Sequence, residues 1–221
     1  MAFWIANIAG LAVAYLCGSI PTAYMAGKLL YDLDVRQHGS KSVGATNALR
    51  VLGKWPALVV PLVDILKGAT AIIFVRWLCS WLFSDPFVAP PPALDQQIWT
   101  PWAVGMAGLA AMVGHSRSIW LKFSGGKAVA TGLGVVLAIS WPVALGALTV
   151  FGVGMALFRI VSLGSILAAL MAIALIFSLE QPLSYRLLVV AGGIYVVARH
   201  SANIKRLLAG TEPRIGQSLG R

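Results

Sequence analysis

Long apolar runs separated by short polar stretches cover almost the whole chain. The apolar runs are residues 3–25, 55–83, 101–113, 128–158, 160–179 and 184–197. A helix crosses a bilayer with about 20 apolar residues and satisfies its own backbone hydrogen bonds. Residues 128–158 are too many for one simple span, and Pro142 disfavours a continuous helix there. With two short helices joined near Trp141, the pattern predicts an all-α membrane protein, a polytopic bundle of about seven transmembrane helices.

The polar stretches between these runs differ in charge. Residues 28–54, 115–127 and 199–221 are basic, whereas residues 84–100 contain four prolines, two aspartates and no lysine or arginine. Cytoplasmic loops of membrane proteins carry an excess of lysine and arginine. With seven helices, all three basic stretches face the cytoplasm, the N-terminus lies outside and the C-terminus is cytoplasmic. Six helices would export the basic tail, against this rule.

Composition agrees with a single membrane domain over residues 1–221. Hydrophobic residues make up 59% of the chain and charged residues 11%, about half the charged fraction of a soluble domain. The net charge of +10 does not indicate nucleic-acid binding, because the basic residues are confined to loops. Anionic lipid or an anionic substrate fits them better. Cys17 and Cys79 lie in apolar runs without metal-like spacing, so neither a disulfide nor a metal site is expected.

The first basic stretch combines turn-forming, hydrogen-bonding and cationic residues. Gly39 and Gly44 permit turns and close backbone approach to a ligand. The polar side chains around them are Ser40, Lys41, Ser42, Thr46, Asn47 and Arg50. An arginine fork binds phosphate oxygens bidentately, and a capped helix N-terminus favours an anion. An ordinary positive-inside loop is the alternative, but such a loop does not require this set of residues.

The second basic stretch begins with His115 and ends with Ser-Gly-Gly-Lys127. Its glycine turn resembles a phosphate-cradling turn with exposed backbone N–H groups and a following cation. The spacing of a Walker A motif is absent, and a helix-connecting turn is the simpler alternative.

The third basic stretch runs over residues 200–212. If the last helix continues, His200 and Asn203 lie on one face, and Lys205 and Arg206 follow at the membrane surface. The alternative is a basic amphipathic tail on anionic lipid.

Common catalytic patterns are missing from the sequence. It has no metal-like cluster and no His-x4-Asp pattern of common glycerolipid acyltransferases. With few acidic residues, an active site here must act by positioning and charge stabilisation.

Four segments together resemble the bacterial acyl-phosphate:glycerol-3-phosphate acyltransferase family, usually called PlsY. They are Gly18-Ser-Ile-Pro21, the His-Gly-Ser…Gly-Ala-Thr-Asn…Arg50 stretch, Gly114-His…Phe-Ser-Gly-Gly-Lys127, and His200-x-x-Asn-Ile-x-Arg-Leu…Gly-Thr-Glu212. One such segment is weak evidence, whereas four in order at suitable intervals are specific. The resemblance covers essentially the whole chain.

The resemblance implies transfer of a fatty acyl group from acyl phosphate to the 1-hydroxyl of glycerol 3-phosphate, giving lysophosphatidic acid and inorganic phosphate. It implies a multi-pass protein of the bacterial plasma (inner) membrane, with the active site facing the cytoplasm and no cofactor. The expected partners are the two substrates, membrane lipid and the acyl-phosphate-producing enzyme of the same pathway, without nucleic acid. A good leaving group makes a covalent enzyme intermediate unnecessary, so we expect direct transfer, with the substrate's phosphate accepting the hydroxyl proton.

Roles for individual residues follow from the same match. Ser40, Arg50, His200 and Asn203 are expected to be catalytic. Phosphate or substrate binding is expected of Lys41, Thr46, Asn47, His115, Gly125, Gly126, Lys127, Lys205 and Arg206. Glu212 is expected to be structural. The family commonly has Gly-Asn after the serine matching Ser40, and Lys41-Ser42 here leaves the roles of those two positions open.

A membrane transporter for a phosphorylated or other anionic metabolite is the main alternative. It predicts charged residues along a path through the membrane, yet only Asp64 and Lys67 lie well inside a predicted span, spaced for an i,i+3 pair. A non-catalytic scaffold leaves the serine, threonine, asparagine and arginine clustering unexplained.

Overall fold

The computed structural model describes residues 1–88 and 90–217, and this part of the chain is helical. In chain order the helices are α1 (Ala2–Ser19), α2 (Thr22–Tyr31), α3 (Ala45–Val51), α4 (Lys54–Ser84), α5 (Gln96–Ser116), α6 (Val129–Ile139), α7 (Trp141–Phe158), α8 (Val161–Ser178), α9 (Leu183–Arg199) and α10 (Ser201–Leu208), with a 3₁₀ turn η1 (Ile119–Leu121) before α6. No strand forms in the described residues, where one isolated bridge joins Ser118 and Ser124. The predicted all-α class is confirmed.

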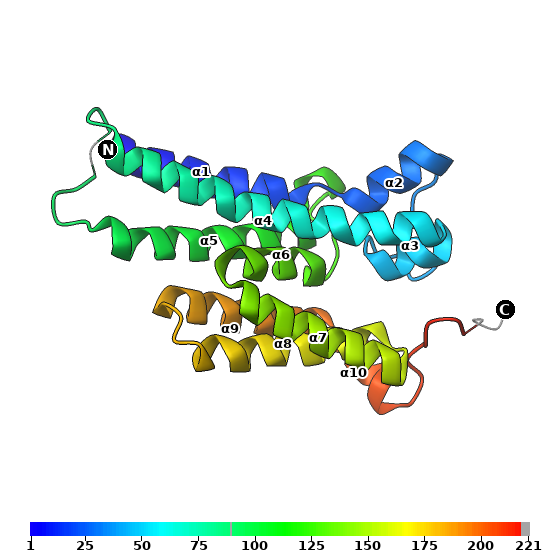
Figure 1. Ribbon diagram of the computed structural model, residues 1–221. Coiled ribbons are helices and arrows are strands. Elements are labelled where there is room, and N and C mark those ends of the chain that lie inside the picture. Colours follow the sequence, from blue (N-terminus) through cyan, green and yellow to red (C-terminus); the bar gives the residue numbers. More distant parts are fainter. Residues whose placement is uncertain (89, 218–221) are drawn as a thin grey trace.

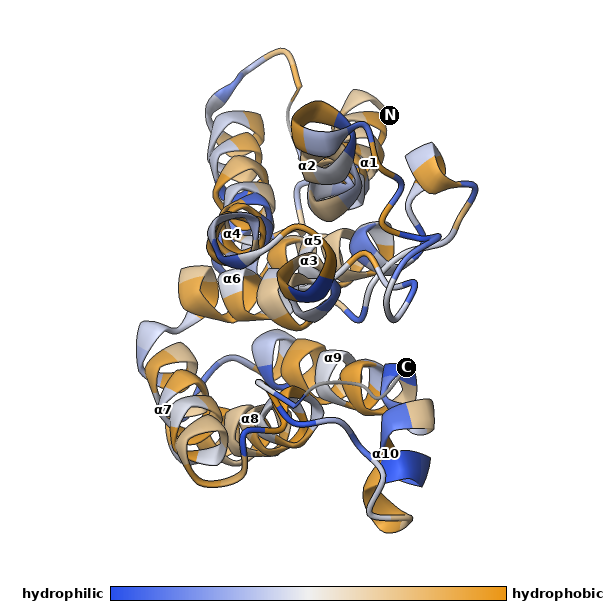
Figure 2. Ribbon diagram, turned by 90° about the vertical axis from the view of Figure 1, so that its right-hand side faces the viewer, coloured by the Kyte–Doolittle hydropathy of each residue, from blue (hydrophilic) through white to orange (hydrophobic). Residues whose placement is uncertain are grey.

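The helices form two groups that lie against each other (Figures 1 and 2). In the first group, α4 packs against α1, α5 and α6, and α3 packs on the end of α4. In the second group, α8 packs between α7 and α9. Contacts of α5 with α9 and of α6 with α7 join the groups. Side chains from both groups line the cavity between them.

Four helices, α1, α4, α7 and α8, are long and apolar enough to cross a membrane, and α9 with α10 makes a fifth if this bent pair is one span. At 11 residues α6 is only about 16 Å long, shorter than the roughly 30 Å hydrocarbon core. The 21-residue α5 carries polar residues at both ends. Several apolar helices are therefore confirmed, whereas the number seven stays a prediction.

The three basic stretches gather at one end of the bundle. The N-terminus and the α4–α5 connection lie at the opposite end from α2, α3 and the described part of the tail (Figure 1). Leu121 in the second basic stretch shares a buried cluster with Val35 in the first. The common location is confirmed, and the membrane side that it faces stays a prediction. Residue 89 of the predicted outer loop and residues 218–221 of the predicted cytoplasmic tail lie outside the described residues.

The predicted first span, residues 3–25, breaks into α1 and α2. Ile20 leaves the helical conformation because the following Pro21 disfavours helix there. The break is held by α4: the Lys67 Nζ donates to the Ile20 carbonyl at 2.7 Å, and the Thr22 hydroxyl donates to Asp64 Oδ1 at 2.9 Å. The expected pair between Asp64 and Lys67 forms at 2.7 Å with both side chains buried.

The predicted division of residues 128–158 is confirmed, since α6 ends at Ile139 and α7 begins at Trp141. The last helix does not run straight through His200, because α9 and α10 meet there at 59°. His200 Nδ1 contacts the Val196 carbonyl at 2.8 Å, and the His200 backbone N–H donates to the Val197 carbonyl instead. The imidazole thus occupies the acceptor that a continuing helix would use, and the backbone bends.

Candidate active site

A cavity of about 880 Å³ lies between the two groups of helices. Its polar end is lined by Ser40, Thr46, Asn47, Arg50, Asp64, His115, Lys127, Ser162, His200, Asn203, Arg206 and Glu212. Its apolar arm extends along α6, α7, α8 and α9 and is lined by side chains such as Val136, Phe151, Ala168 and Val189. The cavity therefore joins a cationic, hydrogen-bonding chamber to an apolar arm, as a ligand with a phosphate head and an apolar tail requires.

Asn47, near the start of α3, holds the loop that carries Ser40. Its Nδ2 lies 2.8 Å from the carbonyls of Val35 and Ser42 and 3.1 Å from that of His38, and its Oδ1 accepts from the Ser40 backbone N–H at 2.8 Å. The hydrogen bonds of this amide therefore all go to the backbone of the loop. Its expected contact with substrate stays a prediction, while the structure gives it a positioning role.

Lys41 occupies a backbone conformation that favours glycine. Its φ is +56°, in the left-handed region. This is the position where the resembling family commonly has glycine, so the local turn is retained with a side chain in its place. The Lys41 side chain is exposed and does not line the cavity within the described residues.

The Gly125-Gly126 turn packs tightly against His115. The Gly126 backbone N–H donates to the His115 carbonyl at 3.2 Å, so this N–H is not exposed to the cavity as expected. A Cβ on Gly126 would collide with the His115 imidazole, and one on Gly125 with the His115 carbonyl. Arg199 donates to the carbonyls of Gly125 at 3.2 Å and Gly126 at 3.0 Å. The turn thus positions Lys127, the next residue, at the cavity.

Lys127 begins a chain of polar contacts that ends in the tail. Its Nζ donates to Asn203 Oδ1 at 2.6 Å, and Asn203 Nδ2 donates to Glu212 Oε1 at 2.6 Å. Ser162 Oγ also donates to Glu212 Oε1, at 2.7 Å, and Arg206 Nε donates to Glu212 Oε2 at 2.6 Å. Glu212 therefore accepts hydrogen bonds from three side chains, and Asn203 connects it to the cation in the chamber, while its structural role stays a prediction.

Burial and neighbouring charges shift two pKa values in this network. Burial lowers the pKa of the Lys127 ammonium, and the Arg206 and Arg199 guanidiniums lower it further against the opposing effect of Glu212. Burial alone would raise the pKa of the Glu212 carboxyl, but hydrogen bonds from Asn203, Ser162 and Arg206 lower it below its usual value. The carboxylate form is the one that the network requires.

We expect Glu212→Gln to destabilise the fold by about 2 kcal/mol, because it removes a buried carboxylate that accepts three side-chain hydrogen bonds. Since the pKa of Glu212 is lowered in the folded protein, its contribution is present at neutral pH and lost as the pH falls through that pKa. Thermal unfolding in detergent at neutral and acidic pH measures the loss of stability and its dependence on pH. Glu180→Gln, an exposed acid in the α8–α9 turn, is the control, and equal unfolding temperatures for the two variants would contradict the role.

His200 uses one ring nitrogen in the fold and leaves the other, Nε2, for a ligand. A carbonyl oxygen only accepts, so His200 Nδ1 donates to Val196. In the neutral ring, Nε2 is then an acceptor for a substrate hydroxyl. His200 is buried and lines the cavity, consistent with its expected role at the reaction centre.

Arg50 lies in the last turn of α3, is exposed and lines the cavity. Among the described residues, none accepts a hydrogen bond from this side chain, in contrast to Arg199 and Arg206. Its five donors are therefore available to a phosphate.

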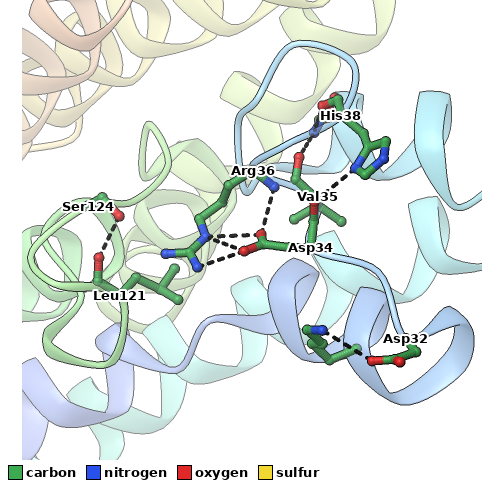
Figure 3. Close-up of polar contacts among 9 residues, drawn as sticks. Asp32, Asp34, Val35, Arg36, His38, Leu121 and Ser124 are labelled. Carbon is green, nitrogen blue, oxygen red and sulfur yellow. Dashed lines mark hydrogen bonds and ion pairs between the residues drawn. The ribbon is translucent and has the colours of Figure 1, made fainter.

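Arg36, in the same basic stretch, is used differently. Figure 3 shows its guanidinium turned to Asp34, beside the Leu121–Ser124 segment. Arg36 Nη2 donates to Asp34 Oδ2 at 2.7 Å, and Arg36 Nε donates to Asp34 Oδ1 at 3.0 Å. It also covers the Tyr24 ring at 4.9 Å. The hydrogen bonds from Arg36 lower the pKa of the Asp34 carboxyl. This pair fixes the loop outside the cavity.

Most of the expected site residues line one cavity, and their individual roles stay predictions. Within the described residues, the cavity lining omits Lys41, Gly125, Gly126 and Lys205. The sequence did not single out Arg199 or Ser162. Their hydrogen-bond partners, Gly126 and Glu212, lie 73 and 50 residues away along the chain. No group of three or more His, Cys, Asp or Glu side chains able to hold a metal is present in the described residues.

Comparisons with known proteins agree with this geometry. The sequence pattern of the glycerol-3-phosphate acyltransferase family matches residues 8–210. The chain is 65% identical over 217 residues to glycerol-3-phosphate acyltransferase 2 of Rhizobium johnstonii, covering 98% of this chain and 99% of the relative. It is 53% identical to a glycerol-3-phosphate acyltransferase of Acaryochloris marina, covering 98% of this chain and 96% of the relative.

Two solved structures are also similar. Both are crystal structures of PlsY (YgiH), an integral membrane glycerol 3-phosphate acyltransferase, and both are 34% identical to this chain. The glycerol 3-phosphate form has a TM-score of 0.81 and covers 95% of this chain and 96% of the solved one. The lysophosphatidic acid form has a TM-score of 0.78, with 95% of each chain covered.

Proposed function

The chain belongs to the glycerol-3-phosphate acyltransferase family, and on that premise we propose that it transfers a fatty acyl group from acyl phosphate to the 1-hydroxyl of glycerol 3-phosphate. The products are lysophosphatidic acid and inorganic phosphate, and the pathway is phospholipid biosynthesis. The observation that carries this proposal is the cavity, in which Arg50 and Lys127 face a chamber continuous with an apolar arm. The solved relatives with glycerol 3-phosphate and lysophosphatidic acid support the same acceptor and product.

The transfer is a single substitution at the acyl carbon. The 1-hydroxyl oxygen of glycerol 3-phosphate bonds to the carbonyl carbon, and the bond from that carbon to the phosphate oxygen breaks. The bonding electron pair leaves with the phosphate, which also takes the hydroxyl proton. Atoms and charge balance without a covalent enzyme intermediate. Accumulation of an acylated enzyme in a single-turnover experiment would contradict direct transfer.

Each chamber residue has a distinct role in this step. The Arg50 fork binds a phosphate bidentately, and the Lys127 ammonium stabilises the charge on the phosphate that leaves. His200 Nε2 accepts a hydrogen bond from the 2-hydroxyl of glycerol 3-phosphate and so orients the neighbouring 1-hydroxyl, whose proton goes to the leaving phosphate. Ser40 and Thr46 donate to phosphate oxygens at the mouth of the chamber. Holding two phosphates together requires cations, because the substrates otherwise repel each other.

Phosphate release by the purified full-length protein in nanodiscs tests this function. With palmitoyl phosphate and glycerol 3-phosphate together, we expect stoichiometric formation of phosphate and lysophosphatidic acid. Omission of glycerol 3-phosphate is the control for donor hydrolysis. No acceptor-dependent release, combined with uptake of glycerol 3-phosphate into proteoliposomes, would favour a transporter and overturn the proposal.

We further propose that residues 1–221 form one integral-membrane domain in the bacterial plasma (inner) membrane, with the chamber facing the cytoplasm. The gathering of basic stretches at one end supports this orientation. The acyl-phosphate-producing enzyme of the pathway would then approach the same face.

Cysteine labelling tests the orientation. In a variant with Cys17 and Cys79 replaced by alanine, we expect an impermeant maleimide added to intact spheroplasts to label Ala93→Cys but not Ala209→Cys. Both positions are exposed, so both should react once the membranes are opened. The reverse pattern in intact spheroplasts would place the chamber outside.

The lowered pKa of Lys127 predicts an early alkaline limit to activity. The charged, protonated lysine is the active form, and its pKa lies below that of an exposed lysine. The rate should therefore decline at a lower pH than an ordinary lysine would dictate. Lys127→Arg, if active, should move this decline to higher pH, because arginine stays protonated. Identical alkaline limbs for the two proteins would assign the titration to another group.

A further inference from the structure

The apolar arm of the cavity ends at a definite floor. Along α8 the lining residues include Ser162, Ser165, Ala169 and Ala172, and the lining stops there. One turn further on the same face is Ile176, which is fully buried and not part of the lining. The arm therefore follows α8 from the polar chamber and stops before Ile176.

The two neighbouring helices end the arm at the same depth. On α7, which runs back toward the chamber, the last lining residue at the far end of the arm is Ala147. The next turn away from the chamber holds the fully buried Val143. On α9 it ends at Leu188, three residues after the buried Tyr185. All of these side chains pack in one buried cluster with Ala172 and Ile176. The floor is thus formed by three helices and lies inside the protein core.

The arm has a length that suits part of a fatty acyl chain. Ten residues of α8 separate Ser162, in the polar chamber, from Ala172, at the floor, which corresponds to about 15 Å. Three bonds of extended backbone span about 3.5 Å, so an extended chain advances about 1.2 Å per bond. The path from the chamber to the floor therefore accommodates roughly 12 bonds of a fatty acyl chain.

We infer that Ala147 and Ala172 limit the length of the acyl chain that the site binds well. Resting on the proposed function, this inference assigns the specificity of the donor to two small side chains at the end of the arm. Alanine leaves the last part of the arm open, whereas a larger side chain at either position points into the volume that the chain end would occupy. The inference concerns binding of the chain end and leaves the chamber chemistry unchanged.

Competing octanoyl phosphate against palmitoyl phosphate tests this assignment. For Ala172→Phe, we expect the palmitoyl-to-octanoyl ratio of kcat/KM to fall about fifteenfold, since each buried methylene contributes a factor of about four and the ring displaces at least two. Ala174→Phe is the matched control, because Ala174 lies on the same helix with an exposed side chain and should keep the parent ratio. Ile176→Ala lowers the floor and should raise the stearoyl-to-palmitoyl ratio about fourfold per added methylene.

A folded and active Ala172→Phe with the parent ratio would overturn the inference. If thermal unfolding shows that this variant does not fold, Ala172→Val and Ala147→Val carry the test, with an expected fall of about fourfold each. Failure of the proposed function has a different signature, since the parent protein would then release no acceptor-dependent phosphate from either donor.

Discussion

Replacing Arg50 with alanine is expected to lower kcat/KM for glycerol 3-phosphate about a thousandfold, the effect of removing one preorganised donor from developing charge. Arg50 lines the chamber, and none of the described residues accepts a hydrogen bond from it. Its loss therefore breaks no internal contact and removes only charge and donors offered to substrate. Phosphate release under subsaturating acceptor measures the effect.

The substitution Arg50→Lys separates charge from geometry. We expect it to recover only part of the lost activity, because an ammonium cannot form the bidentate contact of a guanidinium. Lys54→Ala, which removes an exposed cation at the start of the neighbouring α4, is the control and should keep the parent rate. Parent-like activity in Arg50→Ala would remove this residue from the site.

Gly126→Ala is expected to lower activity about a hundredfold, the cost of moving a reacting group by about 1 Å. The added Cβ meets the His115 imidazole, which is buried and cannot withdraw, so the turn itself must shift. Lys127 is the next residue, and its ammonium would leave the chamber position that Asn203 now fixes. Phosphate release and thermal unfolding should be measured together, so that misplacement is distinguished from unfolding.

Gly152→Ala is the matched control for this substitution. A Cβ on Gly152 in α7 meets nothing within 4 Å, so the same chemical change should leave activity unaltered. If Gly126→Ala retained parent activity, the turn would not determine the position of Lys127. A double variant with His115 also replaced by alanine restores space, and partial recovery there would identify the collision as the cause.

Features of the fold that depend on residues close together in the sequence were predictable. Proline at position 142 divides one apolar run into α6 and α7, and the i,i+3 spacing of Asp64 and Lys67 gives their ion pair. The bend at His200 was not predictable from spacing. It depends on whether the His200 imidazole or the His200 backbone N–H donates to the Val196 carbonyl, and both choices suit the same sequence.

The site was predictable as a set of residues, and less so in its division of roles. Short polar side chains can hydrogen-bond a ligand or the backbone of a loop equally well. Asn47 forms its hydrogen bonds with the loop backbone. The contact of Arg199 with the Gly125-Gly126 turn joins residues more than seventy positions apart, for which the local sequence holds no signal. Only the folded chain decides between these uses of the same chemistry.

The Asp64–Lys67 pair also bears on how the protein enters the bilayer during biogenesis. A single charge near the middle of a nascent segment costs about 3 kcal/mol on insertion scales. In α4 the two opposite charges are one helical turn apart, so they can neutralise each other before α1, α2 or α5 has packed nearby. The segment can therefore leave the translocation channel sideways as a nearly neutral unit. Thr22 and the Ile20 carbonyl then become the partners that align the other helices with it.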